Sequence, residues 1–147
     1  MRFLGLLKAD QETEKGVLPD EKFLTAMGAF FEEGTKSGVI LSGEGLQPSS
    51  QGFRVRYAAK KRTVTDGPFA ETKELIAGYA IIQASSQAEA IEWTKRFVKV
   101  DAPGRHGAQS ECELRRMFDL EEFAANSAEQ PGSRRQVEQR LHNSSGL

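Results

Sequence analysis

The stretch Thr65-Asp66-Gly67-Pro68-Phe69-Ala70-Glu71-Thr72-Lys73-Glu74 combines a tight-turn sequence with three carboxylates and a lysine. Gly67 accepts backbone angles that other residues avoid, and Pro68 fixes its own φ and disfavours helical geometry at the residue before it. The chain is therefore predicted to turn sharply here, with Gly67 at positive φ. Charged side chains follow the turn directly, in a loop of the kind that often carries function.

Strands are predicted on both sides of this turn. Residues 53–57 alternate between apolar and arginine side chains, which predicts a strand with one apolar and one basic face. Residues 62–65 are expected to return as its hairpin partner through a turn at residues 58–61. After the turn, residues 75–82 are almost entirely apolar, which is typical of a strand covered on both faces, so this segment is predicted to be a central strand.

Two amphipathic helices are predicted from the spacing of apolar residues. The first begins at residues 18–21, with Pro19 in its first turn, and ends near Gly38. The second begins after Ser86, which forms a capping-box pattern with Glu89. The inward faces are expected to carry Phe23, Leu24, Met27, Phe30 and Phe31 in the first helix, and Ala90, Ile91, Thr94, Phe97 and Val98, with Trp93 alongside, in the second.

The remaining segments complete an α+β fold. Further strands are predicted at residues 3–7, 39–41 and 111–118, loops at residues 9–16, 42–48 and 101–109, and a short helix at residues 119–123. The resulting order is βαββαβ with an added β-hairpin, as in a ferredoxin-like antiparallel sheet with helices on one face. Residues 1–123 are expected to form this domain, and residues 124–147 a polar C-terminal tail that is mobile or weakly helical.

The composition argues against several classes of protein. The chain has 147 residues and a formal net charge of −1, from 20 Lys and Arg against 21 Asp and Glu, so no global field favours nucleic acid. No run approaches the ~18 consecutive apolar residues of a membrane span, and residues 1–8 are predicted to be a strand rather than a signal peptide. The single cysteine, Cys112, is expected to be a small buried side chain, and a reducing cytoplasm suits this cysteine count.

No familiar catalytic or cofactor signature occurs in the sequence. It contains no Gly-x-Ser-x-Gly elbow, no Walker sequence and no dinucleotide fingerprint. His106 and His142 have no cysteine or carboxylate partner at ligand spacing, so no zinc site is expected. We therefore expect neither a metal nor another cofactor.

The DGPF turn at residues 66–69 and the Gly-rich segment LSGEGLQP at residues 41–48 carry a family resemblance. With these motifs the chain resembles the DGPF branch of the YCII-related family. The resemblance implies small bacterial proteins with a ferredoxin-like fold that pair as a dimeric α/β barrel. It also implies a genetic context beside alternative sigma factors, and hence a regulatory protein partner. The broader group carries a His-Asp pair for acid/base chemistry, but residues 19–23 here read PDEKF, without the histidine.

The candidate ligand-binding residues lie in and beside the two loops that are rich in glycine and proline; they are Glu44, Arg54, Asp66, Phe69, Glu71 and Lys73. A carboxylate among them could accept a proton or bind a small polar ligand, while a lysine or arginine contacts an anionic group. The structural alternative is that Asp66 hydrogen-bonds its own turn, and that Glu71 and Lys73 form a solvated face.

These residues lead to two functional expectations and to no assigned catalytic residue. The first is a small-molecule-binding or regulatory homodimer, because the alternating residues of 53–57 would expose an apolar face that a second copy could cover. The second is a lyase- or isomerase-like enzyme that uses Asp66 or Glu44 as its acid or base.

Overall fold

The computed structural model describes residues 1–69, 74–105 and 109–127. The chain divides into two compact units, Met1–Arg116 and Met117–Leu147. The second unit contains α4 (Leu120–Ser127), and the ring of Phe118, which precedes this helix, lies with its centroid 4.9 Å from that of Phe123 in the helix. This helix is longer than the four or five residues predicted from the sequence.

The first unit is built on a four-stranded antiparallel sheet in the order β2-β5-β1-β6. Its strands are β1 (Arg2–Lys8), β2 (Ile40–Gly45), β5 (Ile76–Gln83) and β6 (Cys112–Arg116). β5 pairs with β2 on one side and β1 on the other, so the prediction of a central strand is confirmed. With the helices in place, the main elements follow the predicted βαββαβ order, with the hairpin inserted before β5.

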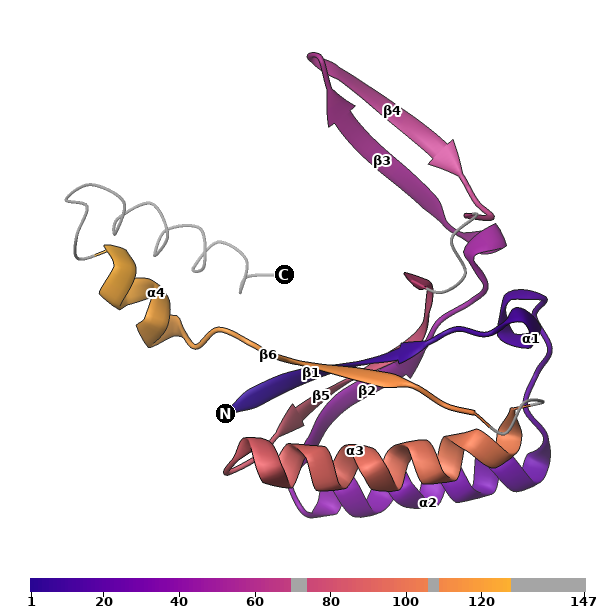
Figure 1. The fold of residues 1–147 in the computed structure, drawn as a ribbon, viewed down its shortest axis with the longest axis vertical. Helices are drawn as coiled ribbons and strands as arrows, with labels where there is room; N and C mark the ends of the chain where they lie inside the picture. The colour runs from indigo at the N-terminus through magenta and orange to yellow at the C-terminus, as the bar shows by residue number, and fades with distance from the viewer. Residues whose placement is uncertain (70–73, 106–108, 128–147) are drawn as a thin grey trace. The chain divides into compact units, whose positions relative to one another are not determined.

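The two long helices lie on the same side of the sheet (Figure 1). They are α2 (Glu21–Lys36) and α3 (Gln87–Asp101), capped by the side chains of Asp20 and Ser86. Since Asp20 is the N-cap, Pro19 precedes the helix, and its predicted place in the first turn is wrong. Gly38 follows the end of α2 at a φ of 76°, the left-handed geometry that closes many helices.

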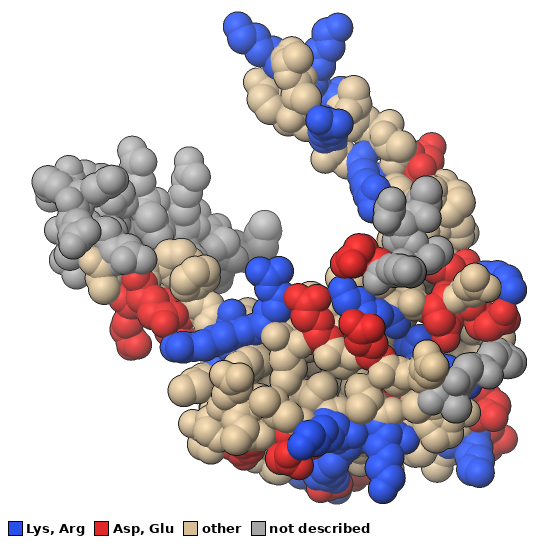
Figure 2. Space-filling model, viewed as in Figure 1, with Lys and Arg blue, Asp and Glu red and all other residues tan. Residues whose placement is uncertain are grey.

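The DGPF turn follows a hairpin that forms a sheet of its own. β3 (Phe53–Ala58) pairs with β4 (Lys61–Asp66), as predicted, through a two-residue turn in which Ala59 and Lys60 both have positive φ. The paired faces differ: one carries Phe53, Val55, Tyr57 and Val64, and the other carries Arg54 and Arg56. Figure 2 shows lysine and arginine side chains gathered over this hairpin.

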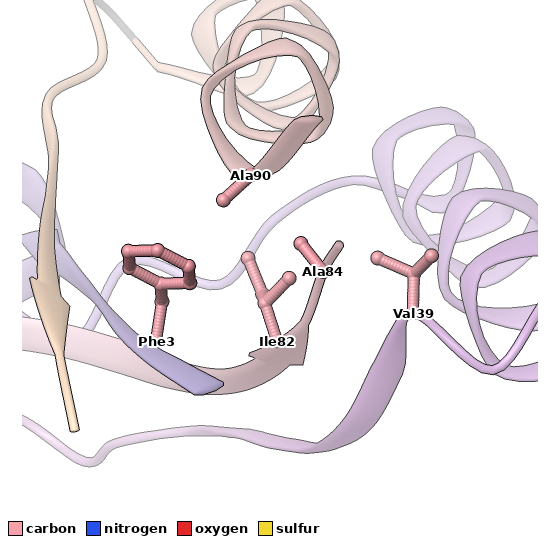
Figure 3. Packing of buried hydrophobic residues seen from close by; sticks show 5 residues of the cluster. All are labelled: Phe3, Val39, Ile82, Ala84 and Ala90. Atoms are coloured by element: carbon pink, nitrogen blue, oxygen red, sulfur yellow. The ribbon is translucent and has the colours of Figure 1, made fainter. Parts of the chain in front are cut away.

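The core lies between the sheet and the two helices. Ala90 of α3 points toward Phe3 and Ile82 of the sheet, with Ala84 and Val39 beside them (Figure 3). Further along, the ring of Phe30 packs against Phe31, Trp93 and Phe97, with centroids 5.7–6.0 Å apart. The predicted inward places of Leu24 and Ile91 are wrong, because these side chains are 57% and 38% exposed.

Three segments predicted as loops contain regular structure. β2 continues through Gly43 to Gly45, so the prediction of a loop here from the glycines is wrong. Residues 9–16 contain α1 (Gln11–Glu14), where Asp10 and Thr13 form a reciprocal capping box. Asp101 belongs to the last turn of α3, which leads into η3 (Ala102–Gly104). A further 3-10 turn, η1 (Ser49–Gln51), precedes the hairpin.

Candidate ligand-binding cavity

A cavity of about 710 Å³ lies between the sheet and the two long helices. Residues of β1, β2, β5, β6, α2 and α3 line it, together with α1, η3 and the segments next to them. This volume falls within the range of about 300–1,000 Å³ that is typical of small-molecule sites.

The floor of the cavity is made of small residues on the helix-facing side of the sheet. Gly5 pairs with Ala80, and Gly78 pairs with both Leu7 and Gly45. Residues directly opposite each other in a sheet share a face, so all of these positions point toward the helices. A Cβ atom at Gly45 would have no heavy atom within 4 Å, which shows that open space lies above this position.

The walls of the cavity are largely aromatic. Phe23, Phe30 and Phe31 come from α2, and Trp93 and Phe97 come from α3. Helical spacing places these rings on one face of each helix. Most of the aromatic stripe that the sequence assigned to the core therefore also encloses this cavity.

A buried ion-pair network stands at one end of the cavity. Arg105 contacts two carboxylates: its Nε lies 2.5 Å from Asp101 Oδ2, and its Nη1 lies 3.2 Å from Asp10 Oδ2. Ser110 Oγ donates to Asp101 Oδ2 at 2.6 Å. Asp101 is 2% exposed, yet these donors satisfy its carboxylate. Partial burial opposes ionisation of Asp10, but hydrogen bonds with Thr13 and the charge of Arg105 hold its pKa below the ordinary value.

Cys112 adds a thiol beside this network. It lies in β6, lines the cavity and is half-buried rather than fully buried. Burial raises the pKa of the Cys112 thiol to about 11, and the nearby carboxylate of Asp101 adds to the shift. The group is therefore a neutral thiol at neutral pH and a poor nucleophile.

The residues predicted as a site do not meet in this cavity. Glu44 lies in β2, a strand that lines the cavity, but it is directly opposite Tyr79, so its side chain belongs to the face of the sheet away from the helices. Among the described residues that line it, Arg54, Asp66 and Phe69 are absent. Glu71 and Lys73 lie outside the described part of the chain. A site shared by Glu44, Asp66 and Lys73 thus stays a prediction.

The base of the hairpin has its own contacts. The guanidinium of Arg54 stacks over the ring of Phe69, 3.8 Å from its centroid. Ser49 receives a hydrogen bond from Phe69 N and gives one to Glu14 Oε2 of α1. The prediction of positive φ at Gly67 is wrong. Glycine is needed there because a Cβ would stand 1.8 Å from Ser49 O.

Reasoning from the sequence missed the network of Asp10, Asp101 and Arg105. All three lie in segments that were predicted as loops. One signal was present for Asp101: it stands four residues after Phe97 and continues the inward face of α3. An acid on an apolar helix face requires a buried partner, and Arg105 is that partner.

Two kinds of feature are absent from the described residues, namely a metal-binding group and a membrane-spanning helix. No group of three or more His, Cys, Asp and Glu side chains is placed there to hold a metal ion. None of the helices described has the length and apolar character needed to cross a bilayer.

Comparisons with known proteins agree with this architecture. The model of the YCII-related domain matches residues 1–117. The chain therefore belongs to the YCII-related family. It is also 30% identical over 76 residues to the uncharacterized protein R00369 of Rhizobium meliloti (strain 1021). That alignment covers 52% of this chain and 61% of the relative, so the chain spans less than two thirds of that relative's length.

Proposed function

We propose that this YCII-related protein binds a small, largely apolar molecule in the cavity between the sheet and the two long helices. The observation that supports the proposal is the cavity itself, with its glycine floor, aromatic walls and a few polar groups at one end. Sites for small molecules share this construction. Binding without catalysis also suits a chain that lacks the histidine of the related acid/base pair, and it is compatible with a regulatory role.

We further propose that the protein is a homodimer in which the open faces of two sheets pair, as in a dimeric α/β barrel. The face of the sheet opposite the helices carries Leu4, Leu6, Tyr79 and Ile81, paired with one another across β1 and β5. The hairpin adds a second apolar surface, where Phe53, Val55, Tyr57 and Val64 are 62–71% exposed. A second copy would remove these side chains from water, at about 25 cal/mol per Å² of apolar surface buried.

A catalytic alternative is a lyase- or isomerase-like reaction with a carboxylate as acid or base. Of the two carboxylates considered, Glu44 shares with Tyr79 the face of the sheet opposite the helices, and Asp66 ends β4 at the base of the hairpin. In this alternative the substrate would lie beside one of these carboxylates, with the proton to be transferred within hydrogen-bond reach of it.

The proposal is tested by filling the cavity from its floor. Trp93 is the chain's single tryptophan and lines the cavity, so its fluorescence reports occupancy. We expect apolar small molecules to change this fluorescence in the wild-type protein and not in Gly45→Leu, whose side chain enters the open space. Gly28→Leu, on an exposed position of α2 with nothing within 4 Å, is the matched control and should bind normally. Binding that persists in Gly45→Leu would place the ligand elsewhere.

A further inference from the structure

The hairpin of β3 and β4 is strongly cationic (Figure 2). Residues 53–66 hold five of the chain's 20 Lys and Arg side chains and one of its 21 Asp and Glu side chains. Every residue of both strands is exposed, and none of these charged side chains has an ion-pair partner among the described residues. The hairpin therefore presents both charge and apolar surface that its own chain leaves unmatched.

One of these cations lies on the apolar face of the hairpin. Arg62 is directly opposite Tyr57 in the strand register, and Val64 is directly opposite Val55. Residues that are opposite each other in a sheet share a face, so Arg62 stands beside the apolar side chains at the end of the face nearest the turn. Asp66 lies on the same face at the base of the hairpin. A surface that covered the apolar side chains would therefore also meet Arg62.

The open face of the four-stranded sheet carries one carboxylate without a partner. Glu44 of β2 lies opposite Tyr79 of β5, and Tyr79 lies opposite Leu6 of β1. The row ends at Glu113 of β6, and Lys8 Nζ lies 3.2 Å from Glu113 Oε2. Glu44, at the other end of the row, is exposed and has no ion-pair partner in the part of the chain that the structure describes.

We propose that the hairpin of one copy covers the β2 side of the open sheet face of a second copy, where Arg62 of the first copy pairs with Glu44 of the second. This inference rests on the proposed homodimer and names a contact that holds it together. An apolar surface laid over Glu44 would leave a carboxylate without water or a partner, which is a costly arrangement. Arg62 supplies the opposite charge from within the apolar face itself. In a two-fold symmetric dimer this contact occurs twice.

Charge complementarity favours a second copy over a polyanion as the partner of the hairpin. The whole chain is close to neutral, so the part outside the cationic hairpin has an excess of acids. A nucleic acid would match the cations through its phosphates, but it would leave the apolar side chains beside Arg62 without a counterpart. A second copy offers an apolar sheet face and an unpartnered carboxylate together.

Charge reversal at each position tests the pairing, with the dissociation constant of the dimer measured by analytical ultracentrifugation. We expect Glu44→Arg and Arg62→Glu each to weaken the dimer at least about tenfold, because each variant places like charges together at two contacts. Both positions are exposed in the single chain, so circular dichroism is expected to show an unchanged fold. Arg56→Glu is the matched control, because it makes the same change on the opposite face of the hairpin and should keep the dimer.

A mixture of the two single variants separates a contact between copies from a contact within one chain. In a mixed dimer one contact is the natural pair and the other is the same pair with its charges exchanged, so we expect the mixture to dimerise nearly as tightly as the wild type. A mixture as weak as the single variants, or single variants that dimerise like the wild type, overturns the contact between Arg62 and Glu44 and leaves the homodimer standing. A wild type that is monomeric at micromolar concentration overturns both proposals.

Discussion

The α-carbon of Gly67 lies so close to Ser49 that a side chain at residue 67 would stand 1.8 Å from the Ser49 carbonyl oxygen. The backbone of Gly67 also donates to the carbonyl of Gly52 at 2.9 Å. The turn after β4 is thus packed directly against η1. This relationship explains the glycine of the DGPF sequence by close approach between two backbone segments.

Gly67→Ala is expected to destabilise the protein. The added methyl group must displace backbone rather than a flexible side chain, so we expect a loss of more than about 1 kcal/mol, measured by urea denaturation. Gly28→Ala is the control, since its Cβ meets nothing within 4 Å and alanine favours a helix interior. An unchanged midpoint for Gly67→Ala would show that η1 moves aside without cost.

Arg105→Met is expected to be strongly destabilising. It leaves the carboxylate of Asp101, 2% exposed, without its cation, and such a change typically costs about 3–5 kcal/mol. Arg96→Met is the matched control, because the Arg96–Glu33 pair is exposed and should be worth less than about 1 kcal/mol. Thermal denaturation of the two variants separates them. Similar melting temperatures would contradict a structural role for the buried network.

The raised pKa of the Cys112 thiol predicts that the free energy of unfolding decreases with pH in the alkaline range. The folded state holds the thiol pKa at about 11, above its ordinary value of 9.0, so the folded state keeps its proton more tightly than the unfolded state. The resulting stabilisation is complete below pH 9 and is lost as pH rises through 11. We expect Cys112→Ala to show a flatter decline in the free energy of unfolding between these limits.

The same thiol should resist alkylation in the folded protein. At pH 8, iodoacetamide is expected to react with folded wild-type protein far more slowly than with the protein in urea, since little thiolate is present in the folded state. Equal rates in the two states would contradict the raised pKa.

The oligomeric state of the protein tests whether the open face of the sheet is a dimer interface. We expect light scattering at micromolar concentration to give the mass of a dimer for the wild type and of a monomer for Leu6→Lys. Leu24→Lys makes the same change on an exposed position of α2 and should leave the dimer intact. A monomeric wild type, or a dimer that survives Leu6→Lys, would contradict sheet-to-sheet pairing.

Much of the fold was predictable because strong local signals agreed with the tertiary structure. The apolar run of β5, the alternation of β3 and the capping residue Ser86 each identified their element correctly. The glycines of β2 were misleading, since glycine is a weak strand former when its neighbours are ignored. Their spacing was informative in retrospect: Gly43 and Gly45 are two residues apart and face the same side of the sheet.

The candidate site was less predictable than the fold. Turn chemistry drew attention to residues 65–74, whereas the cavity depends on which faces of distant elements meet. Gly5, Gly78 and Gly45 are ordinary residues in the sequence and become a floor only when β1, β5 and β2 pair. Likewise, the structural role of Arg105 depends partly on its ion pair with Asp10, which lies 95 positions earlier in the chain. Tertiary packing brings the two residues together.

The glycines of the sheet are of two kinds: at some positions the fold requires glycine, and at others a side chain would fit. A Cβ at Gly43 would stand 2.6 Å from the Phe31 ring, and one at Gly78 would stand 2.9 Å from the carbonyl of Glu44. At Gly45 a side chain meets nothing within 4 Å, and at Gly5 it meets only ordinary contacts from 3.5 Å outward. The size of the proposed binding cavity could therefore differ between proteins of this architecture through residues 5 and 45 alone, while the backbone and topology stay the same.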